Sequence, residues 1–236
     1  MKTLVKKIVN AVGFDLRRRE DPFLEQKRIL GEIERPTIFD VGAHFGAVTR
    51  LYRSLFPLSK IYAFEPFPDS YARLQDNLKG MLEVYPFKIG LSDKKGLTDF
   101  RVNRSSATNS LFETDERAAE TWGAGRLETK ATAQLDFTTL DDFLDAQKIE
   151  CVDILKLDVQ GAEFKVLEGA REALKNGRIK LVYSEIITLP TYKGQKSLHE
   201  ILSLFESYGL WLHNFYNLST VNGRLRQVDA IFTKRG

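Results

Sequence analysis

Apolar residues recur along the chain in two alternating patterns, continuous runs and helical spacing. Short runs over residues 37–41, 60–64 and 83–89 predict strands, because apolar runs bounded by turn signals are typical of buried strands. Helical patterns follow the first two runs, one ending near residue 56 and the other covering 68–78. Strand–helix alternation is therefore expected from residue 37 onward.

The alternation returns in the second half of the chain. Thr139 is placed to cap a short helix. Residues 151–157 and 180–187 are nearly continuous in apolar character, as strands covered on both faces are. The spacing predicts an amphipathic helix over 163–175 after the first of these strands and another over 197–208 after the second.

The C-terminal end changes character. Residues 210–215 and 228–232 flank an Asn222-Gly223 turn and predict an antiparallel hairpin. The repeated strand–helix order requires crossover connections, so we expect an α/β fold with a mainly parallel, doubly wound sheet. Ligand sites in such sheets lie at the carboxyl ends of the strands.

An N-terminal helical extension is expected over residues 1–35, ahead of one domain over 36–236. Helical spacing over 23–33 stops at Pro36, since the residue before a proline disfavours helix. Residues 1–19 are amphipathic and basic. The favoured interpretation is a helix packed on the flank of the domain, and the alternative is peripheral contact with an anionic membrane surface.

Two segments depart from the regular order. Residues 97–102 predict an extra strand, paired through a Lys95-Gly96 turn. Residues 103–130 are rich in polar side chains and show little periodicity. A loop of this length in a compact domain is usually functional or else disordered, and we favour a lid or a substrate-binding segment.

Composition narrows the class of protein. The 236 residues are 43% hydrophobic and 28% charged, which is typical of a globular domain. A net charge of +3 is too small for a dedicated nucleic-acid binder, so no nucleic-acid partner is expected. Cys151 is the only cysteine, which excludes an intramolecular disulfide. No apolar stretch is long enough to span a membrane, and a cytoplasmic protein is the simplest interpretation.

Candidate chemistry lies at the predicted strand ends. The first strand leads into a turn that contains Asp40, Gly42 and Gly46, whose glycines allow close approach of a ligand. This turn lacks the GxGxxG spacing of dinucleotide sites, which argues against a nicotinamide-dependent oxidoreductase. Glu65 ends the second strand and can accept hydrogen bonds from a ribose diol. Without a ligand, the first segment would simply be a tight turn and Glu65 an exposed acid at the end of a strand.

The later strands carry further acids to the same edge. Lys156 and Asp158 interrupt a buried apolar run, and a buried charge without a partner is costly. Glu163 opens the next helix, where a helix-dipole role and a catalytic role are equally open. Glu185 ends the fifth strand. Acids gathered in this way favour a cationic cofactor, a metal, or a general base with a raised pKa.

The motifs DVGAHFG at 40–46, FEP at 64–66, LSD at 91–93 and LKLDVQGAE at 155–163 resemble those of the FkbM family of S-adenosylmethionine-dependent methyltransferases. SEI at 184–186 and VDAIF at 228–232 are similar to that family as well. The resemblance implies a class I, Rossmann-like fold with a seven-stranded sheet whose last two strands form an antiparallel hairpin. It also implies O-methylation of hydroxyls on sugars, glycans or natural products, with S-adenosylmethionine as cofactor.

The resemblance assigns roles to individual residues. It implies that the first loop holds the methionine end of the cofactor, with the ribose, adenine and sulfonium contacted by residues on later strands. The cofactor-binding residues implied are Asp40, Gly42, His44, Gly46, Glu65, Ser92, Asp93 and Asp158. The catalytic residues implied are Asp158, beside the acceptor oxygen, and Glu185, which lines the acceptor pocket.

Two positions depart from the family pattern. His44 stands where asparagine is usual, and its charge can vary near neutral pH, so we expect cofactor affinity to fall in acid. Gln160 stands where glutamate is frequent. The loss of that carboxylate disfavours a divalent cation, so no metal site is expected.

A sugar hydroxyl is weakly acidic, so methyl transfer to it benefits from a base. Asp158 and Glu185 are the candidates, with His199 an outsider that is better explained as a surface or packing residue. Tyr192 and Lys193 are expected to contact acceptor hydroxyls or a phosphate. The alternative function is a non-catalytic module that binds the cofactor or a protein partner.

Overall fold

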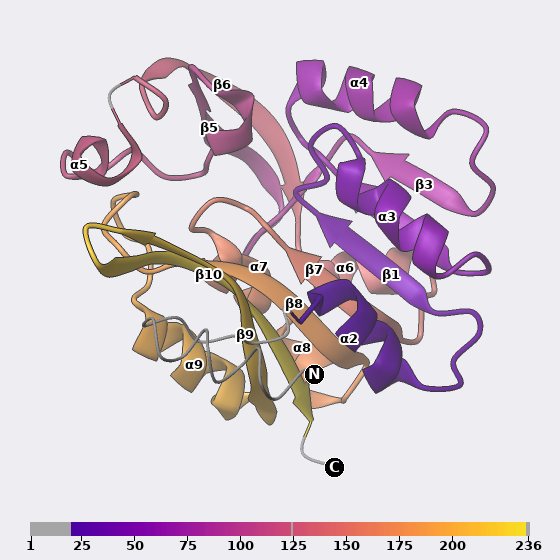
Figure 1. Cartoon of the computed structure of the whole chain (residues 1–236). Helices are drawn as coiled ribbons and strands as arrows, with labels where there is room; N and C mark the ends of the chain where they lie inside the picture. Colours follow the sequence, from indigo (N-terminus) through magenta and orange to yellow (C-terminus); the bar gives the residue numbers. More distant parts are fainter. Residues whose placement is uncertain (1–19, 124, 235–236) are drawn as a thin grey trace, which may run out of the picture.

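A seven-stranded sheet in the order β3-β2-β1-β7-β8-β10-β9 runs through the molecule (Figure 1). The computed structural model describes residues 20–123 and 125–234. The strands of this sheet are β1 (Thr37–Val41), β2 (Lys60–Phe64), β3 (Val84–Phe87), β7 (Val152–Leu157), β8 (Ile179–Ile187), β9 (Leu210–Val221) and β10 (Arg224–Lys234). The first five pair in parallel, and β10 is antiparallel to both β8 and β9. The expected class I fold with its C-terminal antiparallel hairpin is confirmed.

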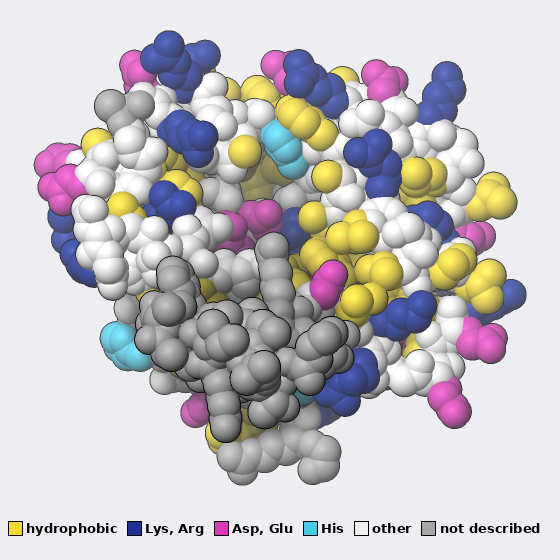
Figure 2. Space-filling view, viewed as in Figure 1, with side chains coloured by type: hydrophobic (Ala, Val, Ile, Leu, Met, Phe, Trp, Pro, Cys, Tyr) yellow, Lys and Arg dark blue, Asp and Glu magenta, His cyan; other side chains and the backbone are white. Residues whose placement is uncertain are grey.

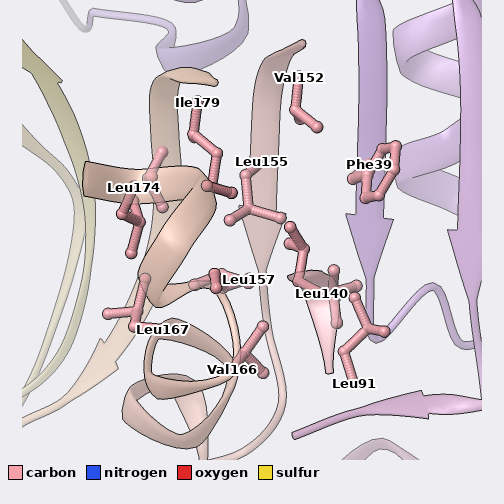
Figure 3. Packing of buried hydrophobic residues seen from close by; sticks show 14 of the residues in the cluster. Phe39, Leu91, Leu140, Val152, Leu155, Leu157, Val166, Leu167, Leu174 and Ile179 are labelled. Atoms are coloured by element: carbon pink, nitrogen blue, oxygen red, sulfur yellow. The ribbon is translucent and has the colours of Figure 1, made fainter. Parts of the chain in front are cut away.

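Helices cover both faces of the sheet, as a doubly wound fold requires. The helices are α2 (Pro22–Leu30), α3 (Ala47–Leu55), α4 (Pro68–Leu78), α5 (Ala118–Trp122), α6 (Leu140–Ala146), α7 (Glu163–Glu168), α8 (Arg171–Lys175) and α9 (Leu198–Ser207). Side chains of α2, α3 and α4 pack on one face of the sheet. Those of α6, α7, α8 and α9 pack on the other face, where the buried leucines of β7 lie among α6, α7 and α8 (Figure 3).

A second, three-stranded sheet lies over the carboxyl ends of the main strands (Figure 1). It consists of β4 (Gly90–Leu91), β5 (Gly96–Asn103) and β6 (Thr129–Thr138), in the order β4-β6-β5. The prediction that residues 97–102 form an extra strand is confirmed. The expected pairing through the Lys95-Gly96 turn is wrong, because β5 pairs antiparallel with the distant β6.

The segment 103–130 holds more regular structure than its composition indicates. It contains the 3-10 helix η1 (Ser106–Thr108) and α5, and an isolated bridge joins Thr114 to Tyr192. Trp122 of α5 donates from its indole nitrogen to Thr191 Oγ1, 2.8 Å away. These contacts attach the segment to the loop that follows β8.

Local signals in the sequence account for most element ends. The Thr139 hydroxyl accepts a hydrogen bond from Asp142 N and caps α6 as expected. Asn222 and Gly223 have φ values of 49° and 72°, which suits the tight turn of a hairpin. The helix expected over 163–175 is divided into α7 and α8. Gly169 lies between them. A Cβ atom there would lie 2.0 Å from the Ser92 carbonyl oxygen, so a glycine is needed for the backbone to pack this closely against Ser92.

The N-terminal prediction is only partly covered by the structure. The helix expected over 23–33 is present as α2, which Asp21 caps and which ends at Leu30. The membrane-surface hypothesis for residues 1–19 lies outside the described residues. Within the part of the chain that the structure describes, no helix is both long and apolar enough to cross a membrane.

An aromatic cluster fixes α6 against the sheet. The Phe143 ring meets the Phe64 ring edge-on, with centroids 4.8 Å apart, and also contacts Phe39 and Phe87. Edge-to-face pairs add to the free energy gained from burying the rings. Phe143 therefore joins three strands at once.

We predict that Phe143→Ala lowers the free energy of unfolding by about 3–5 kcal/mol, because it removes a buried aromatic ring and leaves a cavity. Urea denaturation followed by circular dichroism measures the change. Leu82→Ala is the control, since this leucine is 85% exposed and its loss should cost less than about 0.5 kcal/mol. Equal effects of the two substitutions would contradict the packing described.

Candidate functional site

A cavity that is partly open to solvent lies where the carboxyl ends of β1, β2 and β7 face the small sheet. Figure 2 shows acidic side chains gathered in the hollow at the centre of the viewed face. The cavity is lined by residues of both sheets and of the η1 segment: Val41, Gly42, His44, Phe64, Glu65, Pro66, Gly90, Leu91, Phe100, Ser106, Ala107, Asn109, Leu111, Phe137, Asp158, Val159 and Gln160.

The turn after β1 forms one wall and depends on its glycines. Gly42 has a φ of 77°, and a Cβ atom there would lie 1.9 Å from the Asp158 carbonyl oxygen. Only glycine permits this approach of the turn to the end of β7. Gly46 has a φ of 81° and lies against Leu74 of α4. Both glycines expected at the site thus shape its backbone.

His44 lies at the rim of the cavity. Its Nε2 is 2.9 Å from Ser106 Oγ, so the turn after β1 is joined to η1. Burial lowers the pKa of His44, although the charge of Asp158 opposes this effect. The change in charge that the sequence suggested for His44 is therefore moved toward lower pH, and its effect on ligand affinity stays a prediction.

Asp40 lies behind the cavity and not in its wall. Side chains alternate along β1, so Asp40 points to the face covered by α3, where it accepts a hydrogen bond from Thr49 Oγ1 at 2.6 Å. Lys156 Nζ lies 3.0 Å from Asp40 Oδ1. Both side chains of this ion pair are buried, and Asp40 is fully enclosed.

Lys156 joins this ion pair to the turn after β1. Its Nζ donates to the Gly42 carbonyl oxygen at 2.9 Å and lies 3.7 Å from Asp158 Oδ2. Burial alone would lower the pKa of Lys156, yet Asp40 and Asp158 together raise it. From the sequence, Lys156 is only a charge within a buried apolar run. The structure shows that Asp40, Asp158 and the Gly42 carbonyl oxygen are its partners.

Glu65 reaches the cavity from the end of β2. Its carboxylate accepts hydrogen bonds from the backbone N–H groups of His44 and Phe67, each at 3.0 Å. Burial raises the pKa of Glu65 to about 7, against the effect of the two donors. Two donors leave free lone pairs on the carboxylate, which can accept further hydrogen bonds from a ligand.

Ser92 and Asp93 lie beyond the cavity lining. Ser92 Oγ donates to Asp93 Oδ1 at 2.8 Å, and Asp93 forms an ion pair with Lys165 at 3.1 Å. The residues of this segment that line the cavity are Gly90 and Leu91. The role of Ser92 and Asp93 in cofactor binding stays a prediction.

Asp158 and Glu185 come together through an amide. Asp158 lines the cavity, and its side chain is 38% exposed. Gln160 Nε2 donates to Asp158 Oδ1 and to Glu185 Oε2, at 3.0 Å in each case. Burial raises the pKa of Glu185, as do the nearby charges of Asp158 and Glu163. The two predicted catalytic acids therefore share one donor at the same end of the sheet.

Glu163 supports the loop that carries Gln160. Its Oε1 accepts hydrogen bonds from the backbone N–H groups of Val159 at 3.1 Å and Gly161 at 3.2 Å. Burial raises the pKa of Glu163 to about 7. This side chain is 4% exposed and does not line the main cavity, so its contacts are those of a residue that shapes a loop.

The remaining candidates are spread over a wider region. Tyr192 is buried, and its hydroxyl lies 3.0 Å from Gln160 Oε1. Lys193 forms an exposed ion pair with Glu113 at 3.4 Å. His199 contacts Ser197 Oγ at the start of α9. Lys193 and His199 do not line the cavity. Gln227, which the sequence did not single out, donates to Glu185 Oε1 at 2.7 Å.

A family model and two relatives similar to this chain are all described as methyltransferases. Residues 40–210 match the family model described as "Methyltransferase FkbM domain". The chain is 27% identical over 194 residues to the 2-O-methyltransferase NoeI of Sinorhizobium fredii, covering 78% of this chain and 77% of that protein. It is 26% identical over 170 residues to the hexuronic acid methyltransferase AglP of Haloferax volcanii, covering 71% of this chain and 63% of that protein.

Among solved structures, the precorrin-6y C5,15-methyltransferase of Geobacter metallireducens is similar to this chain with a TM-score of 0.47 and 13% identity, covering 90% of this chain and 88% of that one. The magnesium protoporphyrin IX methyltransferase of Synechocystis, solved with bound cofactor, has a TM-score of 0.45 and 12% identity, covering 99% of this chain and 97% of that one.

We predict that Lys156→Met lowers the free energy of unfolding by about 3–5 kcal/mol, because it leaves Asp40 buried without its cation. The double variant Asp40→Asn/Lys156→Met should recover part of this loss, since it removes the uncompensated charge. Urea denaturation of the two single variants and the double variant measures the coupling.

Lys175→Met is the matched control for this cycle. Lys175 pairs with Glu172 at 3.6 Å, and the two side chains are 57% and 63% exposed. Removal of such a surface pair should cost less than about 1 kcal/mol. A loss in Lys156→Met no greater than in Lys175→Met would contradict a structural role for the buried pair.

Proposed function

The chain belongs to the FkbM family of S-adenosylmethionine-dependent methyltransferases, and from this premise we propose that it methylates a hydroxyl group of a sugar or glycan. The observation that carries the proposal is the position of Asp158. This acid lines the cavity and is also joined, through Gln160, to the buried Glu185. A base that borders both the donor and the acceptor regions is what O-methylation needs.

The cavity suits the cofactor of this family. Phe100, Leu111 and Phe137 give it an apolar wall, while Glu65 and Asp158 provide acceptors on the other side. An apolar wall fits an adenine ring, and we propose that Glu65 accepts hydrogen bonds from the ribose hydroxyls. S-adenosylmethionine supplies a methyl group that is already activated on a positively charged sulfur.

The acids of the site favour this cationic ligand. Asp158 faces the cavity with a partly exposed carboxylate, and we propose that it stabilises the sulfonium charge. Asp40 is proposed to act indirectly, by holding Lys156 and through it the carbonyl oxygen of Gly42. Its fully buried position supports a positioning role within the cofactor loop.

The acceptor region is polar. We propose that the acceptor hydroxyl enters beside Asp158, and that Asp158 removes its proton as the methyl group is transferred. Glu185 and Tyr192 lie on the far side of Gln160 and are proposed to border the acceptor. The printed activity of NoeI, a 2-O-methyltransferase, and that of AglP, a hexuronic acid methyltransferase, support a sugar acceptor for this chain.

We predict that Asp158→Asn lowers turnover by about 100-fold or more, because the amide cannot accept the hydroxyl proton. Binding of S-adenosylhomocysteine should change only a few-fold. Transfer of a labelled methyl group to a panel of neutral, amino and uronic sugars measures turnover, and calorimetry measures binding. Asp145→Asn is the control, since Asp145 is 74% exposed and pairs with Arg178 away from the cavity. Unchanged turnover in Asp158→Asn would remove Asp158 from this role.

Affinity for S-adenosylhomocysteine should rise with pH through the pKa of Glu65. That pKa is raised to about 7, so the carboxyl is mainly protonated below this value and mainly ionised above it. Only the ionised form accepts from both ribose hydroxyls. Between pH 6 and 8 the ionised fraction grows about tenfold, and the association constant should follow.

The variant Glu65→Gln separates this effect from the titration of other groups. Its amide cannot ionise, so its affinity should be lower at pH 8 and should vary little between pH 6 and 8. Calorimetric titrations of both proteins at several pH values provide the comparison. The same tenfold rise in Glu65→Gln would assign the pH dependence to another residue.

A further inference from the structure

Gln160 lies between the two acids at the acceptor side of the cavity. Its single side-chain amide makes three hydrogen bonds there, each 3.0 Å long. Both N–H groups are used on acids, one on Asp158 Oδ1 and one on Glu185 Oε2. The amide oxygen accepts from the Tyr192 hydroxyl. Ionised carboxylates can only accept, so the two acids fix which end of the amide faces them.

The backbone of Gln160 is held in an uncommon conformation. Its φ is 54°, a value rare for residues other than glycine. Two contacts maintain it: the Gln160 carbonyl oxygen accepts from Ser110 Oγ at 2.7 Å, and Glu163 binds the N–H groups on either side. A strained residue that its surroundings hold in place is typical of a functional site.

The charges around Glu185 show why a neutral donor is needed there. Carboxylates approach it from three further elements: Asp158 after β7, Glu163 on α7 and Asp229 on β10. Lys156 is the cation that counteracts them. Burial and these acids raise the pKa of Glu185, whereas amide donors favour the ionised form, and both Gln160 and Gln227 donate to it.

We propose that Gln160 is a positioning residue for methyl transfer, whose amide holds Asp158 toward the cavity and favours the ionised form of Glu185 beside it. The inference rests on the proposed function, in which Asp158 is the base. Glutamine suits this position because it offers two donors without a charge. A methionine at this position would remove the two donors. A glutamate would remove them as well and would place a third carboxylate beside Asp158 and Glu185.

The titration of Glu185 tests this role without any acceptor. Protein labelled with ¹³C at the glutamate side-chain carboxyls is titrated by NMR with S-adenosylhomocysteine bound, and the Glu185 signal is assigned with Glu185→Gln. The titration midpoint of Glu185 should rise by about half a pH unit or more in Gln160→Met and by about one or more in Gln160→Glu. The acid limb of the pH–turnover profile should move in the same direction.

Gln134→Glu is the matched control. Gln134 also donates to an aspartate, Asp99, but it is exposed on the small sheet. This variant introduces the same charge and should leave both the Glu185 titration and turnover unchanged.

An unmoved Glu185 midpoint in folded Gln160→Met and Gln160→Glu would overturn the inference even if the protein methylates sugars. A moved midpoint with an unmoved pH–turnover profile would overturn the link to catalysis. Failure of the unsubstituted protein to methylate any sugar would count against the proposed function alone, because the NMR titration does not depend on an acceptor.

Discussion

The buried ion pair between Lys156 and Asp40 is the interaction on which the geometry of the site depends. It joins the neighbouring strands β1 and β7 close to their carboxyl ends. Removing two charges from water is costly, and part of this cost is offset by the hydrogen bond from Thr49 to Asp40 and by the one from Lys156 to the Gly42 carbonyl oxygen. One buried cation thus contacts both the turn after β1 and the start of the loop after β7.

The same balance between burial and hydrogen bonding recurs at the acids around the cavity. Glu65 and Glu163 each accept two backbone N–H groups, and Glu185 accepts two side-chain amides. Burial raises the pKa of all three, while the donors oppose it. The acids differ in where they face: Glu65 faces the cavity and Glu163 faces a loop. Similar chemistry therefore occurs both in the wall of the cavity and in the support of a loop.

Much of the main sheet can be predicted from the sequence, because buried parallel strands are continuous apolar runs with clear ends. The small sheet is harder. In β6 the apolar residues Ala131, Ala133, Leu135 and Phe137 do alternate, but polar side chains separate them and the partner strand β5 is far away in sequence. Pairing over such a distance leaves no local signal, so the sequence predicts the extra strand with the wrong partner.

The candidate site shows a similar limit. Strand ends are visible in sequence, so Glu65, Asp158 and Glu185 could be placed at one edge of the sheet. Which face each side chain takes depends on register, and this separates Asp40, which is enclosed behind the turn, from Glu65, which lines the cavity. Contacts such as the Gln160 amide between two acids depend on one loop conformation and have no sequence pattern of their own.

The segment 103–130 gives the site its remaining wall and links its two halves. Ser106 contacts His44 in the turn after β1, and Ser110 binds the Gln160 carbonyl oxygen in the loop after β7. Both serines belong to one short stretch that Asn103 anchors at the end of β5 through Asn109 and Thr108. A displacement of this stretch would change both contacts together. The polar side chains of this stretch make these hydrogen bonds. The same side chains interrupt the apolar periodicity from which its structure could be predicted.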